Sequence, residues 1–334
     1  MTDLLQTKWH RLGWQGIELT VPEEWNLGGI GGGQEEGYLR IQDAEMARVE
    51  LKLATSTGFV NIDAAVDGYL KKIRQDRKQS KDMEIDTDAS VVSKRKMRKK
   101  VLRGFSWRSD MHGLGAAWYC ADCKRTFIAQ VLTKPEEDGP ALAERVLAGI
   151  KDHPTGGWLR WATYNFDAQV PEDFSLTARK LMAGHIQLTF KRDVAARTAR
   201  SIMLQNLVVP EELTLARWGM AGTMLKNKTL QQWAADEMGT RLKRIKPELE
   251  PTETNGHEAV HVSATNLSLQ GPLFRTIARF AEVPYADRIR GLIWHCPKSN
   301  SVHLVQMLID YTNEQLLSEI ASRFHCHSSE DAAD

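Results

Sequence analysis

Alternating hydrophobic and polar residues predict short β-strands in the first part of the chain. The segment Ile17-Glu18-Leu19-Thr20-Val21 alternates and stops at Pro22, which is typical of a strand that leads into a turn. Residues 38–41 and 49–53 alternate in the same way. Because successive side chains of a strand point to opposite faces, the pattern predicts strands that are buried on one face.

Hydrophobic residues at helical spacing predict two helices in each half of the chain. The first begins after Asn61, whose side chain is a good cap for the free amides of the first turn. In the second half the corresponding helix begins at Thr229, and Gln232 completes a capping box. A closing helix follows in each half. The predicted apolar faces comprise Ile62, Ala65, Val66, Tyr69, Leu70 and Ile73; Leu142, Ala143, Val146, Leu147 and Ile150; Leu230, Trp233, Ala234 and Met238; and Leu316, Leu317, Ile320, Ala321 and Phe324.

Three landmarks recur in the same order and predict a tandem duplication. The string Val-Pro-Glu-Glu-Trp at 21–25 returns as Val-Pro-Glu-Asp-Phe at 170–174. A Trp-x-Cys segment at 118–120 returns at 294–296, and a closing helix follows it each time. The length of 334 residues also suggests two domains, at about 150 residues per domain. We expect a first unit at residues 1–154 and a second unit, with insertions, at 155–334.

Each predicted unit has the order strands, helix, strands, helix, which indicates an α+β fold. Since the apolar face of each helix must be buried, we expect two related α/β/α sandwich units, each with a mostly antiparallel sheet and two main helices. This order of elements and the VPEEW and VPEDF strings resemble the PsbP-like family. The resemblance implies a non-catalytic binding module with no shared catalytic motif. Two fused copies depart from the usual single unit, which leaves the partner open.

The cysteines suggest a metal site. Cys120 and Cys123 have the spacing of a zinc knuckle, and a closed zinc site needs two further ligands. The equivalent hairpin of the second copy has Cys296 and lacks the second thiol. Metal binding by Cys120 and Cys123 is one hypothesis, a redox pair is a second, and thiols without a ligand are the third. We therefore expect no cofactor, with zinc as the alternative.

Each closing helix should run back towards the tip of its hairpin. Its end carries His153 in the first copy and His325-Cys326-His327 in the second. About seven strand residues cover ~23 Å, whereas about eleven helical residues cover only ~16 Å. The direction of the predicted helix thus favours an approach of these side chains to the thiols, but its reach is imperfect.

A second motif suggests an enzyme. His257, Glu258 and His261 have the spacing of the zinc-protease signature, which needs both histidines on one helical turn. The neighbouring Val260, Val262 and Thr265 favour a strand, on which the two histidines would lie ~13 Å apart. We therefore expect a strand, and keep a metal-dependent hydrolase as the alternative if the segment is helical.

Two further segments are candidates for anion binding. Residues 28–33 are rich in glycine but match no phosphate-binding register, so we expect a flexible loop between two strands. Six of the seven residues from Lys94 to Lys100 are basic, which suits contact with nucleic acid. Acidic residues at 82–88 precede this run, and we expect the two segments to pair as a hairpin and largely cancel. Nucleic acid is therefore an unfavoured partner.

Composition excludes several classes of protein. Lys and Arg number 44 against 43 Asp and Glu, so the net charge of +1 gives no global attraction to nucleic acid or to a membrane surface. No apolar run is long enough to span a bilayer. We expect no signal peptide, because the first eight residues include an acid and have no apolar core. We expect a cytoplasmic, non-catalytic adaptor that engages another protein. The alternatives are the hydrolase at His257-Glu258-His261 and a zinc-stabilised structural protein through Cys120 and Cys123.

Overall fold

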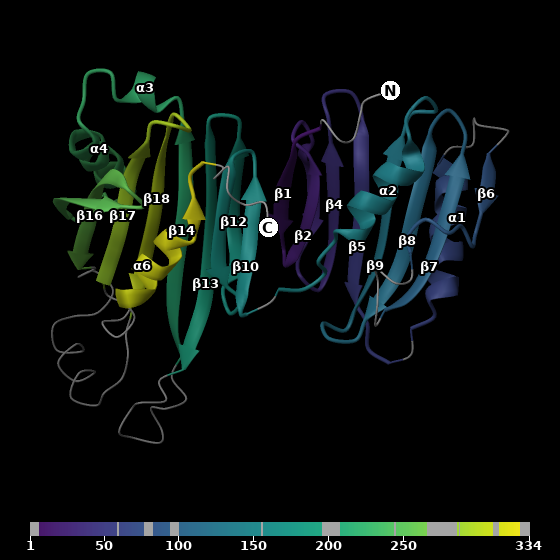
Figure 1. Cartoon of the computed structure of the whole chain (residues 1–334). Helices are drawn as coiled ribbons and strands as arrows, with labels where there is room; N and C mark the ends of the chain where they lie inside the picture. Colours follow the sequence, from purple (N-terminus) through teal and green to yellow (C-terminus); the bar gives the residue numbers. More distant parts are fainter. Residues whose placement is uncertain are drawn as a thin grey trace. The chain divides into compact units, whose positions relative to one another are not determined.

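The chain forms two compact units, Met1–Tyr164 and Asn165–Asp334 (Figure 1). A computed structural model describes residues 7–58, 60–76, 83–93, 100–154, 156–195, 208–243, 245–265, 286, 288–309 and 314–327. The division between the units falls later than the predicted one after residue 154. The reason is that the strand Trp158–Thr163 pairs with the strand Trp9–Trp14, with Ala162 opposite Gly13.

The N-terminal unit is built on a seven-stranded antiparallel sheet with the order β3-β4-β5-β9-β8-β7-β6. A smaller group of strands, β2, β1 and β10, pairs beside it. The elements are β1 (Trp9–Trp14), β2 (Ile17–Pro22), β3 (Asn26–Gly32), β4 (Glu36–Gln42), β5 (Ala47–Thr55), α1 (Ile62–Asp76), β6 (Glu84–Asp86), β7 (Val101–Arg108), β8 (His112–Cys120), β9 (Arg125–Thr133), α2 (Gly139–Ala148) and β10 (Trp158–Thr163).

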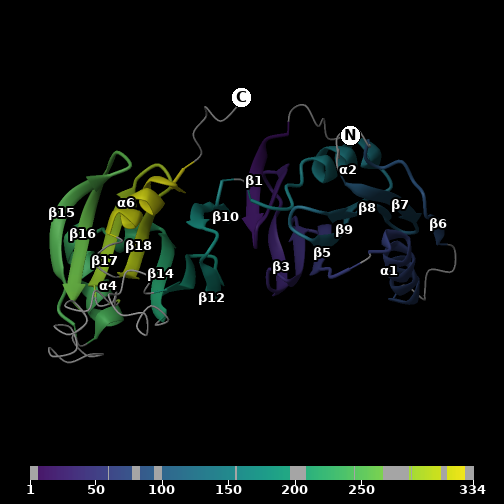
Figure 2. The ribbon, with the colours of Figure 1, turned by 90° about the horizontal axis from the view of Figure 1, so that it is seen from below.

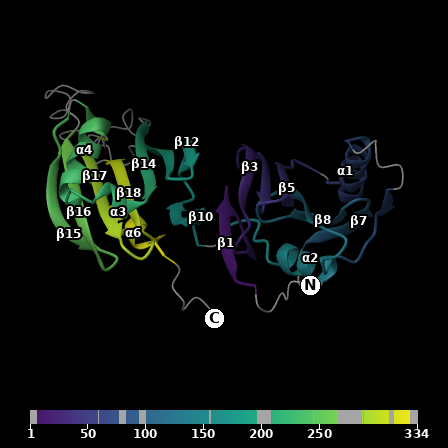
Figure 3. The same ribbon diagram turned by 90° about the horizontal axis from the view of Figure 1, so that it is seen from above.

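The two helices of this unit cover opposite faces of the sheet (Figures 2 and 3). The apolar side of α1 packs on Phe105, Trp107 and Ala117. Since neighbouring residues of a strand face opposite ways, Trp118 of β8 lies on the other face, on the side of α2. Both α1 and α2 therefore have a hydrophobic surface to bury.

The C-terminal unit repeats this strand order. Its seven-stranded antiparallel sheet has the order β12-β13-β14-β18-β17-β16-β15, in which each strand holds the place of its counterpart in the first sheet. The elements are β11 (Phe166–Pro171), β12 (Ser175–Met182), β13 (His185–Ala195), β14 (Val208–Gly219), α3 (Ala221–Met224), α4 (Leu230–Leu242), β15 (Glu248–Thr254), β16 (His257–Thr265), β17 (Arg288–Cys296), β18 (Ser301–Ile309), α6 (Glu314–Ser322) and β19 (Phe324–His325).

In this unit α4 and α6 take the places of α1 and α2. Leu230, Ala234 and Met238 of α4 pack on a buried cluster that includes Val302 and Leu304 of β18. The other helix, α6, packs on β17 and β18, and Figure 2 shows it on the opposite side of the sheet. The fold of both units is therefore strand-rich α+β with mostly antiparallel sheets. None of the helices in the described ranges combines the length and the apolar character that crossing a membrane requires.

Several local predictions are confirmed. The side chain of Asn61 accepts a hydrogen bond from the amide of Ala64 at the start of α1. Thr229 and Gln232 form both bonds of the capping box at the start of α4. The three strands predicted by alternation are β2, β4 and β5.

One local prediction is wrong. Residues 28–32 belong to the edge strand β3 and are not a loop. Glycine there lets the backbone run close to its neighbours, since a Cβ on Gly28 would meet the Gln42 side chain at 2.2 Å. The predicted hairpin between the acidic segment and the basic run involves residues 94–99, which lie outside the described residues. Of the acidic segment, Glu84 and Asp86 lie opposite Arg108 and Ser106 of β7.

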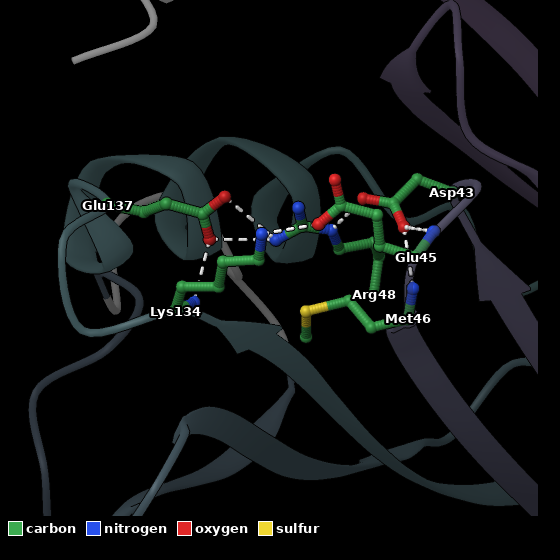
Figure 4. A network of polar contacts seen from close by, with 6 residues as sticks. All are labelled: Asp43, Glu45, Met46, Arg48, Lys134 and Glu137. Carbon is green, nitrogen blue, oxygen red and sulfur yellow. Dashed lines mark hydrogen bonds and ion pairs between the residues drawn. The ribbon is translucent and has the colours of Figure 1, made fainter.

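A buried arginine joins two loops of the N-terminal unit (Figure 4). Arg48 of β5 donates to Asp43 and contacts Glu137 at 3.0 and 2.7 Å. Its guanidinium also lies 5.5 Å from the centre of the Trp25 ring. Arg192 of the C-terminal unit bonds two carboxylates and lies 4.5 Å from the Phe174 ring in the same way. The aromatic residue of each Val-Pro-Glu string is therefore covered by an arginine.

Candidate metal centres

The tips of the β8–β9 and β17–β18 hairpins place one buried cysteine in each unit. Cys120 ends β8 opposite Arg125, and Cys296 ends β17 opposite Ser301. The turns match as well, since each has a residue with positive φ just before the next strand: Lys124 at 54° and Asn300 at 47°. The two hairpins therefore present their cysteines in the same way.

The segment after each closing helix brings a histidine to this cysteine. His153 Nδ1 lies 3.4 Å from Cys120 Sγ, and His327 Nδ1 lies 3.4 Å from Cys296 Sγ. After α2 the chain runs alongside Glu18, which exchanges two backbone hydrogen bonds with Lys151. After α6 it continues into β19, which pairs with β11. These extended residues, at ~3.3 Å each, supply the reach that the helices alone lack.

In the C-terminal unit two more donors complete a group of four. The ligand atoms of His257, Cys296, Cys326 and His327 all lie within 4.8 Å of one another. His257 Nε2 is 3.2 Å from Cys326 Sγ, and Cys326 Sγ is 3.3 Å from His327 Nδ1. The register of β16 with β17 has Ala259 opposite Trp294, so two residues further it places His257 beside Cys296.

These separations match a tetrahedral zinc ion. Zn–S distances of ~2.3 Å and Zn–N distances of ~2.0–2.1 Å put a sulfur and a nitrogen ~3.6 Å apart. Three of the four sulfur–nitrogen distances of this cluster are 3.2, 3.3 and 3.4 Å. A metal ion therefore fits among the four donors after shifts of a few tenths of an ångström.

Burial favours the neutral forms of Cys326 and His257. It raises the pKa of the Cys326 thiol to about 11, and the adjacent Cys296 sulfur acts in the same direction. Burial also lowers the pKa of His257, aided by His327, so its imidazole has a free lone pair. All four cysteines of the chain are free thiols. A divalent cation would thus meet a neutral imidazole at His257 and would displace the proton of the Cys326 thiol.

Aromatic side chains pack together on the strands that carry the cysteines of the four-donor cluster. The ring of His303 stacks on Trp294 at a centroid distance of 5.2 Å, and Phe324 meets both rings edge-on. In the N-terminal unit Phe127 stacks on Trp118 at the same 5.2 Å. This packing holds β17, β18 and the segment after α6 in place, so the cluster rests on rigid elements.

The N-terminal unit brings together a different set of candidate metal ligands. Cys120, Cys123 and His153 bring their ligand atoms within 4.8 Å of one another. Continuing the register of Val101 with Tyr119 by one residue places Lys100, rather than a histidine, beside Cys120. The residue before His153 is Asp152, where the C-terminal unit has Cys326. Lys100 and Asp152 form an ion pair at 2.8 Å.

The structure separates the residues of the predicted hydrolase motif. His257, Glu258 and His261 lie on strand β16, so the segment is a strand as expected, and the two histidines do not share a helical turn. His257 instead joins the cysteines, which sequence reasoning missed. The sequence indicated a strand that begins at His257 and a strand that ends at Cys296. Antiparallel pairing of these two strands brings His257 beside Cys296.

No protein-family model and no curated protein matches the chain. Among solved structures, the chain is similar to the cyanobacterial PsbP protein from Synechocystis sp. PCC 6803, with 10% identity and a TM-score of 0.30 over 45% of this chain and 96% of that one. It is also similar to a protein from Bacteroides thetaiotaomicron, with 8% identity and a TM-score of 0.22 over 75% of this chain and 87% of that one.

Proposed function

We propose that the chain is a non-catalytic binding protein made of two duplicated α/β/α sandwich units, and that its C-terminal unit is built around one structural Zn²⁺ ion. The observation that carries the zinc assignment is the group of four donors, His257, Cys296, Cys326 and His327. Two thiolates and two imidazoles in tetrahedral reach select zinc over hard cations such as Mg²⁺ or Ca²⁺, which prefer oxygen ligands.

The donor number supports a structural rather than a catalytic ion. Four protein ligands close the coordination sphere of zinc, whereas a catalytic zinc keeps a position for water or substrate. The ion would join three segments that are distant in sequence: the start of β16, the end of β17 and the residues after β19. Such a cross-link stabilises the folded state because the unfolded chain offers no preformed site.

The adaptor role rests on the repeated architecture. The same strand order occurs twice, with a helix on each face of each sheet. The free thiols suit a reducing compartment, which supports a cytoplasmic location. The partner implied by the adaptor role is another protein.

The test is the metal content of untagged protein and of paired variants. We expect His257→Ala to lose one zinc ion per chain relative to wild type and to melt at a lower temperature. His261→Ala is the matched control, because His261 lies on the same strand outside the four-donor group. It should keep the full metal content and the wild-type melting temperature.

Cobalt provides a readout that does not depend on folding yield. Metal-free wild-type protein reconstituted with Co²⁺ should show the thiolate-to-cobalt charge-transfer band and the visible bands of a tetrahedral site. The double variant Cys296→Ser/Cys326→Ser should lose the part of that signal due to this site. Equal metal content in wild type and His257→Ala would overturn the assignment.

A further inference from the structure

We propose that the N-terminal unit binds a second Zn²⁺ ion through Cys120, Cys123 and His153, and that this ion keeps its fourth position open for an exogenous monodentate donor. The two units share one Cys–His pair, Cys120 with His153 and Cys296 with His327, at 3.4 Å in both. They differ in the remaining donors. The inference stands on the N-terminal residues alone and does not depend on an ion in the other unit.

The turn and the segment after α2 bring the three donors together. Cys120 Sγ lies 3.4 Å from His153 Nδ1, and Cys123 Sγ lies 3.8 Å from the backbone carbonyl oxygen of Asp152. Burial and the charge of Asp152 raise the pKa of the Cys120 thiol, although the backbone amides of Cys123 and Asp122 act in the opposite direction. A divalent cation would therefore displace the proton of this thiol on binding.

The fourth donor of the other unit has no counterpart here. The position of His257 is taken by Lys100, and that of Cys326 by Asp152. The Asp152 Oδ2 atom accepts from Trp118 Nε1 and Lys100 Nζ, both at 2.8 Å. Its Oδ1 atom contacts His153 Nδ1 at 3.0 Å, so both oxygens of the carboxylate already have partners. Among the described residues, the donors that gather at this hairpin are Cys120, Cys123 and His153.

The site is also accessible. The side chain of His153 is 31% exposed, and Asp122, whose carboxylate lies 3.8 Å from His153 Nε2, is 78% exposed. Three protein ligands, one of them the partly exposed His153, match the open type of zinc site, in which water or another donor takes the last position. Two thiolates neutralise the charge of the ion, and Lys124 offsets the nearby Asp122 carboxylate, so the site has no large negative charge that would repel an anionic donor.

The experiment separates the two sites by paired variants and uses Co²⁺ and azide as probes. Protein kept reduced and then reconstituted should bind about two cobalt ions per chain in wild type and about one in Cys120→Ser/Cys123→Ser. Azide should change the visible cobalt spectrum of wild type and of Cys296→Ser/Cys326→Ser. It should leave the spectrum of Cys120→Ser/Cys123→Ser unchanged.

The outcomes distinguish this inference from the proposed function. If Cys120→Ser/Cys123→Ser binds as much cobalt as wild type, the second site is overturned while the C-terminal site stands. If that variant loses cobalt but azide does not change the spectrum of wild type, the N-terminal site binds metal but has no open position. That result would overturn the proposed open fourth position. Because both decisive measurements use wild type and Cys120→Ser/Cys123→Ser, a folding failure of the other variant does not affect the result.

Discussion

Lys100 contacts Asp152 at 2.8 Å in the N-terminal unit, at the two positions where the C-terminal unit has His257 and Cys326. The side chains of this pair are only 16% and 3% exposed. Burial alone would raise the pKa of Asp152, but Lys100 and Trp118 together outweigh it and lower that pKa. One unit thus joins these segments by an ion pair where the other places two metal donors.

Lys100→Met should lower the free energy of unfolding by about 3 kcal/mol, because it leaves a buried carboxylate without its cation. The matched control is Lys151→Met. Lys151 is 62% exposed and lies 3.8 Å from Glu18, so its loss should change the free energy by less than about 0.5 kcal/mol. Urea denaturation of both variants checks the difference. Equal losses would show that the buried pair contributes no more than a surface pair.

His303 is a buried imidazole at a position where the N-terminal unit has Phe127. Its side chain is fully buried, and neither ring nitrogen has a hydrogen-bond partner among the described residues. His303→Phe should raise the free energy of unfolding by about 1 kcal/mol, since it removes two unpaired polar atoms and keeps the stack on Trp294. The reciprocal Phe127→His should lower the stability of the N-terminal unit.

The same substitution should change the pH dependence of stability. Burial, with the charge of Arg217, lowers the pKa of His303 to about 3. The unfolded state, with a pKa near 6.5, therefore binds more protons between these values, and wild type loses stability as the pH falls below about 6.5. His303→Phe lacks this contribution, so its advantage over wild type should grow from pH 7 to pH 4. A constant difference across this range would contradict the assignment of a lowered pKa.

The periodic patterns predicted the elements well because each reports a local property. Asn61 and Thr229 mark helix starts through bonds to amides within the first turn, and these bonds form as expected. The glycines of β3 led to a wrong prediction of a loop, because the need for glycine there comes from a neighbouring strand. The side chain of Gln42 in β4 lies where a Cβ of Gly28 would be. The pairing of Glu84 with Arg108 also depends on sheet order, which charge alone does not determine.

At the candidate site, too, the local features could be predicted from the sequence, whereas those that depend on strand pairing could not. The Cys120–Cys123 spacing is visible in the sequence, and the return of His153 and His327 follows from the helix direction. The role of His257 required knowledge of which strands are neighbours. The motif His257-Glu258-His261 suggested a helical site, whereas the β16–β17 register takes His257 to Cys296 and leaves His261 elsewhere on the strand.

Arg48 should be more important to the N-terminal unit than any exposed charge near it. Arg48→Met leaves Asp43 and Glu137 without a shared partner and should lower the free energy of unfolding by about 3 kcal/mol. Arg48→Lys should recover only part of this, because one ammonium cannot reproduce the planar contacts to both carboxylates. Lys134→Gln is the control: its partner Glu45 is 66% exposed, and we expect a much smaller loss.

The loss in Arg48→Met should also depend on pH. Burial opposes the charged form of Asp43, but bonds from Met46, Arg48 and Glu45 together lower its pKa. Since the folded pKa lies below the unfolded value of about 3.9, this contribution is present above that value and is lost as the pH falls through the folded pKa. The difference between wild type and Arg48→Met should therefore shrink when denaturation is repeated at progressively lower pH. A difference that stays constant down to pH values below the folded pKa would mean that Arg48 acts through packing on Trp25 rather than through its carboxylate partners.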